Sequence, residues 1–139
     1  VALMPLLIGS GGNAGAQAAT LVVRAIATGE IGSGDWWKLL LREIGVSAAI
    51  GLAMSGAAFF LGWALGDLRV ALVVALSMTT VVIAGSLMGT VLPMLLNKLK
   101  LDPATASVPL ITSMADILGV LIYFSIANAV LRFVHLNAP

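Results

Sequence analysis

Four long apolar windows constrain this chain more than any other feature. They run over 1–27, 39–65, 70–97 and 104–132 of the 139 residues. Each is at least as long as the roughly 20 residues that a helix needs to cross a bilayer core of about 30 Å. Charged residues make up only 9% of the chain, against about 25% in soluble domains. The short alternating segments of a membrane β-barrel do not occur. The sequence therefore predicts an all-α, polytopic membrane helix bundle with four transmembrane helices, forming one domain over 1–139.

The basic residues predict how this bundle lies in the membrane. One side of the membrane receives Arg24, Lys38, Arg42, Lys98 and Lys100. The other side receives Arg69 and Arg132. Because basic residues favour the cytoplasm, the links 28–38 and 97–104 are predicted to be cytoplasmic. Residue 1 would then start on the outer side, so we expect one further helix before it in an intact chain that begins in the cytoplasm.

Several function classes are excluded by composition. The net charge is only +1 and there is no basic cluster with interleaved aromatic residues, so no nucleic-acid partner is expected. The absence of cysteine excludes disulfides and thiolate metal sites. The single histidine, His135, lies just past the last window and has no nucleophile paired with it by any pattern in the sequence. An enzyme is therefore not expected.

The acidic residues fall into two groups. Glu30, Asp35, Asp67, Asp102 and Glu43 lie in links or near window ends. We expect these five to be solvated or interfacial. Asp116, in contrast, lies near the middle of the window 104–132. A lone carboxylate at that depth costs on the order of 2.5 kcal/mol or more, and such residues usually serve a transport pathway. The structural alternative is a protonated aspartate that bonds a neighbouring helix.

Oxygen-bearing groups share the helix face of Asp116. By helical spacing this face includes Pro109, Thr112, Gly119 and Tyr123, with Ser113 beside them. Pro109 removes a backbone donor and is expected to free a carbonyl near Thr105, although a simple kink is the alternative. Carboxylate, hydroxyl and carbonyl oxygens are the ligands that Mg²⁺ and Ca²⁺ take.

The first window carries a polar stripe. At helical spacing lie Gly9, Asn13, Gln17, Thr20 and Arg24. The neighbouring glycines, among them Gly12, would let a backbone or a hydrated ion come close and would permit local unwinding. The stripe is therefore predicted to line a water-filled path. The alternative is tight helix packing, for which Gly85 and Gly89 also have the required spacing.

Charge balance predicts how many copies form the path. A divalent ion at membrane depth needs about two negative charges, and one chain offers only Asp116. A two-fold homodimer, the commonest symmetric assembly, would offer two. Because Mg²⁺ sheds its waters reluctantly, the pair would hold the hydrated ion. Two rivals remain open, namely a proton-coupled transporter with Asp116 as relay and a purely structural membrane module.

Two stretches carry a specific resemblance. "PLLIGSGGNAGAQAATLVVRAIATGEI" and "VLPMLLNKLKLDPATASVPLITSMADILGVLIYFSIA" closely resemble the transmembrane domain of the MgtE family of magnesium channels and transporters. The resemblance covers almost the whole chain. It implies an inner-membrane homodimer with five transmembrane helices per chain, of which this sequence would hold the second to the fifth, and a pore for Mg²⁺ at the dimer interface.

The resemblance also implies roles for individual residues. Asp116 would bind hydrated Mg²⁺, and the carbonyl of Thr112 would be a further contact. Gly9 and Asn13 would line the pore near the ion. Family members usually carry cytoplasmic regulatory domains that sense Mg²⁺, and nothing of that kind is present in these 139 residues.

Overall fold

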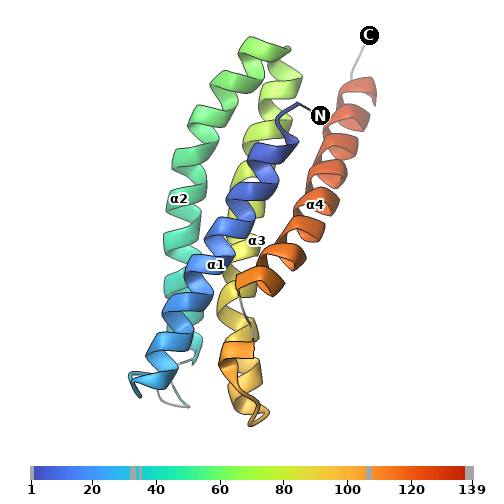
Figure 1. The fold of residues 1–139 in the computed structure, drawn as a ribbon. Helices are drawn as coiled ribbons and strands as arrows, with labels where there is room; N and C mark the ends of the chain where they lie inside the picture. Colours follow the sequence, from blue (N-terminus) through green and yellow to red (C-terminus); the bar gives the residue numbers. More distant parts are fainter. Residues whose placement is uncertain (1, 32–33, 35, 106–107, 137–139) are drawn as a thin grey trace.

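The fold is a bundle of long helices (Figure 1). The computed structural model describes residues 2–31, 34, 36–105 and 108–136, the last four of these by their backbone only. In chain order the elements are α1 (Met4–Ala27), α2 (Trp36–Leu65), α3 (Leu68–Lys98), the 3-10 turn η1 (Pro103–Thr105) and α4 (Val108–Leu136). The described residues contain no strand. The predicted all-α membrane bundle is confirmed.

Among the residues that the structure describes, three helices are long and apolar enough to cross a membrane, namely α2, α3 and the part of α4 that ends at Arg132. α1 has 24 residues, which is long enough for a span. Its glycines and amides make it less apolar than the other three. The structure accounts for the glycines, because Gly11 and Gly15 pack on α3 and Gly12 on α4, whereas the amides of Asn13 and Gln17 are exposed.

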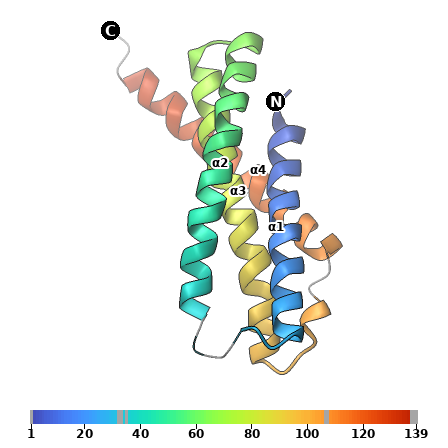
Figure 2. The same ribbon diagram turned by 90° about the vertical axis from the view of Figure 1, so that its left-hand side faces the viewer.

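α3 lies at the centre of the bundle and packs against all three other helices. Figure 2 shows α1 and α2 on either side of it. The buried residues that join the three helices are Leu7, Ala58, Val74, Met78 and Val82. Without a hydrophobic driving force between helices in lipid, association rests on such close packing.

Glycines bring the backbones of α1 and α3 into direct contact. A Cβ atom added to Gly85 would lie 2.2 Å from the carbonyl oxygen of Gly11. One turn further, a Cβ on Gly89 would lie 2.0 Å from the carbonyl oxygen of Gly15. α1 is one uninterrupted helix, so the expected unwinding is wrong. At Gly11 and Gly15 the packing alternative holds.

Aspartate side chains cap the starts of α3 and η1. The turn between α2 and α3 is closed by Asp67, whose side chain accepts a hydrogen bond from the backbone N–H of Val70 at 3.0 Å. Asp102 likewise accepts from the N–H of Ala104 at 2.9 Å, at the start of η1. These are the N-cap contacts that Asp favours.

The last helix begins later than predicted. The window 104–132 was expected to be one helix, but Thr105 belongs to η1 and α4 starts at Val108. Pro109 therefore lies in the first turn, where a helical residue has no intrahelical acceptor for its N–H. The predicted kink and the carbonyl freed near Thr105 are both wrong, because the proline starts the helix and does not interrupt it.

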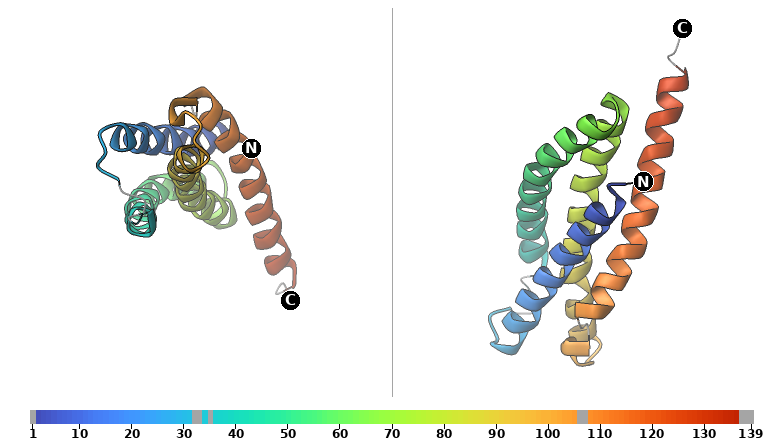
Figure 3. Two further views of the ribbon diagram at one scale, coloured as in Figure 1. Left: turned by 90° about the horizontal axis from the view of Figure 1, so that it is seen from below. Right: turned by 45° about the horizontal axis from the view of Figure 1, so that its top comes forward.

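α4 packs on the bundle through its first half only. Its buried residues are Ile111, Ala115 and Gly119, and no described side chain beyond Gly119 is buried. Figure 3 shows the second half of α4 diverging from the other helices. α1 and α3 end, and α2 begins, at the same end of the bundle (Figure 1). This is the end that carries the two basic links.

Candidate functional site

The candidate site is the contact between Asp116 on α4 and Gly12 on α1. A Cβ atom on Gly12 would lie 3.3 Å from Asp116 Oδ1 and 3.5 Å from Thr112 Cγ2. A glycine here lets the carboxylate lie against the backbone of α1. At 1.5 Å per residue, Asp116 is about 12 Å along α4 from its first residue. The carboxylate is nevertheless exposed in the single chain.

The hydroxyls near Asp116 present acceptor oxygens. Thr112 Oγ1 donates to the carbonyl oxygens of Val108 and Pro109, at 3.0 Å to each. Ser113 Oγ donates to the carbonyl oxygen of Pro109 at 2.8 Å. A hydroxyl has one proton and two lone pairs. Each of these hydroxyl protons is already donated to a carbonyl of α4. The oxygen lone pairs of Thr112 and Ser113 are therefore left to accept hydrogen bonds from groups outside α4.

Two residues predicted to line the path face the bundle. Gly119 is buried, and a Cβ on it would lie 3.5 Å from side-chain atoms of both Ile8 and Val81. Tyr123 is half-buried and packs against the core of α1, α2 and α3. In the single chain both therefore contribute to packing, although their spacing from Asp116 matches a shared face.

The predicted polar stripe of α1 does lie on one side of the helix. Its exposed members are Gly9, Asn13, Gln17, Thr20 and Arg24. A Cβ on Gly9 would meet nothing within 4 Å. Gly9 and Asn13 lie three residues before and one residue after Gly12, so the Asp116 carboxylate lies at the edge of the stripe.

The outward faces of α2 and α4 have the opposite character. Large apolar side chains are exposed there, including Leu52, Phe60, Trp63, Ile117 and Leu121. Such faces suit a lipid environment. Exposing an amide to hydrocarbon costs free energy. The outer side of α1, which carries the amides of Asn13 and Gln17, therefore suits a polar environment.

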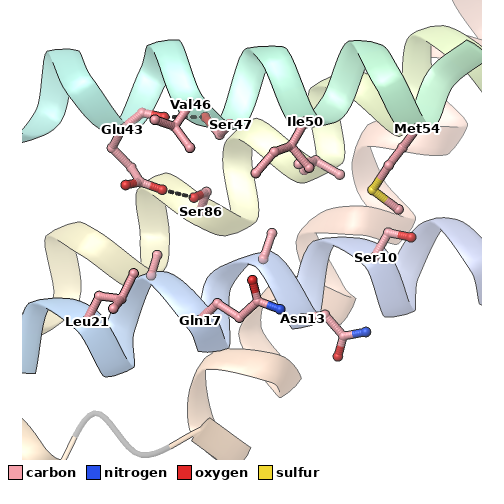
Figure 4. A pocket seen from close by; sticks show the side chains of 13 residues that line it. Ser10, Asn13, Gln17, Leu21, Glu43, Val46, Ser47, Ile50, Met54 and Ser86 are labelled. Atoms are coloured by element: carbon pink, nitrogen blue, oxygen red, sulfur yellow. Dashed lines mark hydrogen bonds between the residues drawn. The ribbon is translucent and has the colours of Figure 1, made fainter.

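Sequence reasoning missed Glu43. It was expected to be interfacial, but it is half-buried and its Oε1 accepts a hydrogen bond from Ser86 Oγ on α3. Figure 4 shows Glu43 facing Gln17 across a cavity of ≈ 400 Å³. One sequence signal was available, because Ser47 follows Glu43 by four residues and marks the same helix face as polar.

Among the described residues, no group of three or more histidine or acidic side chains could hold a metal ion. Near Asp116, one chain supplies one carboxylate and several neutral oxygens.

The chain is similar in sequence to known transporters. Residues 4–126 match the MgtE family, described as divalent cation transporters. The chain is 39% identical to the magnesium transporter MgtE of Thermus thermophilus over 135 residues, which is 94% of this chain and 29% of that protein. It is 40% identical to the MgtE of Bacillus subtilis over 134 residues, 95% of this chain and 29% of that protein. The chain thus spans less than a third of the length of these curated relatives.

Proposed function

The chain belongs to the MgtE family of divalent cation transporters, and from that premise we propose that it moves Mg²⁺ across the membrane. The path lies at the interface of a homodimer. It runs between the polar stripes of α1 and the neighbouring faces of α4. Asp116 from each chain forms the ion site.

The observation that carries this proposal is a polar surface on the outside of a membrane protein. The stripe of α1 and the carboxylate of Asp116 adjoin one another and are exposed in the single chain. Bare exposure of a carboxylate and amides to hydrocarbon is strongly unfavourable. A second copy that encloses water against this surface removes that cost.

Charge and hydration favour a divalent cargo. Two Asp116 carboxylates, one from each copy, balance the charge of one Mg²⁺. The ion keeps several of its waters, and those waters are hydrogen-bond donors. The lone pairs of Thr112 and Ser113, the amide oxygen of Asn13 and, by the family resemblance, the carbonyl of Thr112 would accept from them.

The wider organisation of the protein is proposed on the same premise. The links 28–38 and 97–104 are cytoplasmic, and the protein resides in the inner cell membrane. The described bundle is a pore domain that works with one further helix. The relatives are longer than this chain, and cytoplasmic domains that sense Mg²⁺ are expected to regulate the pore.

The test compares Asp116→Asn with a matched control, Asp67→Asn, in the intact protein reconstituted in liposomes. Asparagine caps a helix as well as aspartate does, so the control should conduct normally. Mg²⁺ influx is followed with an internal indicator, with and without a pH gradient. Loss of selective Mg²⁺ flux in Asp116→Asn alone supports the ion site.

Two outcomes would count against the proposal. Unchanged flux in Asp116→Asn would make this residue structural. Flux that follows the pH gradient, and loses that dependence in Asp116→Asn, would favour the alternative of a proton-coupled transporter with Asp116 as relay.

A further inference from the structure

A second polar region lies between α1 and α2 and borders the polar stripe of α1 through Asn13 and Gln17. These two helices both pack on α3 and make little contact with each other. The groove between them holds the ≈ 400 Å³ cavity. Val82 and Ser86 on α3 also line it, and Figure 4 shows Ser86 beside the carboxylate of Glu43. Asp116 does not line this cavity.

Acceptor oxygens line part of the cavity, beside apolar side chains such as Ala14, Leu21 and Ile50. Three serines contribute, and the proton of each is already donated elsewhere. Ser10 Oγ donates to the carbonyl oxygen of Leu6 and Ser47 Oγ to that of Glu43, each at 2.7 Å. Ser86 Oγ donates to the carboxylate of Glu43. The free lone pairs of these hydroxyls can only accept hydrogen bonds or bind a cation.

Two of the serines are well suited to hold a fixed geometry. Ser47 is 1% exposed and Ser86 is 4% exposed, so neither oxygen can turn freely to bulk water. The amides of Asn13 and Gln17 border the same cavity from α1 and each adds an acceptor oxygen.

The cavity has a single charge. Among its described lining residues only Glu43 is ionisable. Arg24, Glu30 and Arg42 line a separate hollow nearer the basic end of the bundle, which shares Glu43 with the cavity. The two arginines line that hollow and not the cavity, so within the cavity the carboxylate of Glu43 faces neutral described lining residues.

We propose that this cavity is a binding site for a small monovalent cation, distinct from the Asp116 site, with Glu43 as its charged ligand and Ser47, Ser86 and Gln17 as neutral ones. Na⁺ is a hard cation that takes oxygen ligands of this kind. One carboxylate balances one positive charge, whereas a divalent ion in the same place would keep an uncompensated charge at membrane depth. The site goes beyond the proposed Mg²⁺ pathway and does not depend on it.

The test is equilibrium binding of ²²Na⁺ to the purified intact protein in detergent, at constant ionic strength set by choline chloride. The variants are Glu43→Gln, Ser47→Ala and Asp116→Asn. Wild type and Asp116→Asn should bind one saturable Na⁺ per chain. Glu43→Gln should bind at least about tenfold more weakly, because a charged ligand is lost. Ser47→Ala, which removes one neutral oxygen and leaves the carboxylate, should weaken binding severalfold.

Ser47→Ala keeps the test decisive even where Glu43→Gln fails to fold. Thermal unfolding checks both variants. Absence of saturable Na⁺ binding to the wild type would overturn the proposal. So would Na⁺ binding that survives Glu43→Gln, or that disappears in Asp116→Asn. Displacement of Na⁺ by micromolar Mg²⁺, with Mg²⁺ binding itself lost in Glu43→Gln, would assign the cavity to a divalent ion.

Discussion

Replacing Gly89 by alanine should separate α1 from α3. The added Cβ would lie 2.0 Å from the carbonyl oxygen of Gly15, where ordinary contact begins at 3.4 Å. The shortfall is about 1.4 Å. Neither atom can move alone, since the obstacle is backbone on both sides. The helices must therefore part by more than 1 Å along this contact, which forfeits a large share of the local dispersion energy. We expect Gly89→Ala to destabilise the protein by about 3 kcal/mol, at the upper end for overpacked cores.

The matched control is Gly56→Ala on α2, where a Cβ would meet nothing within 4 Å. Alanine gains up to about 1 kcal/mol of helix propensity over glycine, so this variant should be unchanged or slightly more stable. Both are measured by thermal unfolding in detergent, with size-exclusion chromatography to follow the folded fraction. Equal midpoints for Gly89→Ala and Gly56→Ala would refute the direct backbone contact between α1 and α3.

Three further substitutions test other contacts. Gly12→Val should leave the bundle folded but displace the carboxylate of Asp116 and lower Mg²⁺ flux severalfold; wild-type flux in liposomes would contradict their contact. Asp67→Ala removes the acceptor for Val70 N–H and should lower the free energy of unfolding by about 1 kcal/mol. A thermal melt identical to that of Asp67→Asn would show that this cap does not stabilise the protein. Leu7→Ala, at a fully buried position, should destabilise by about 2–5 kcal/mol, and a loss below that range in thermal melts would mean that the core relaxes around it.

The fold was largely predictable because membrane depth leaves few choices. Long apolar windows must be helices, and the basic links had to gather at one end. The start of α4 was not predictable from hydropathy, since residues 104–108 carry no charge and no proline or glycine that would mark a boundary. Pro109 was read as an interruption because a proline signals either a kink or a first turn, and only the position of the preceding turn η1 decides between them.

The candidate site was predicted in part. Asp116 stood out because it is a charge at depth, and its neighbour Gly12 lay in the glycine-rich stretch. The sequence does not show which helix each glycine of α1 contacts. In the structure Gly11 and Gly15 pack on α3, whereas Gly12 contacts α4. Glu43 was missed because it follows Arg42 near a window end, where charges are usually solvated. Its neighbour across the bundle, Ser86, is distant in sequence and shows no pattern that links the two.

The paired glycines of α1 and α3 also have a mechanical consequence. The backbones of α1 and α3 touch at two places one turn apart, Gly11 with Gly85 and Gly15 with Gly89. To slide along α3 without a clash, α1 would have to move by a full helical turn. The two helices therefore form a stiff frame. α4 packs on that frame over about half its length, through Ile111, Ala115 and Gly119. If the proposed path beside Asp116 opens and closes, we expect α4 to tilt against this frame at its contacts with Gly12 and through Gly119.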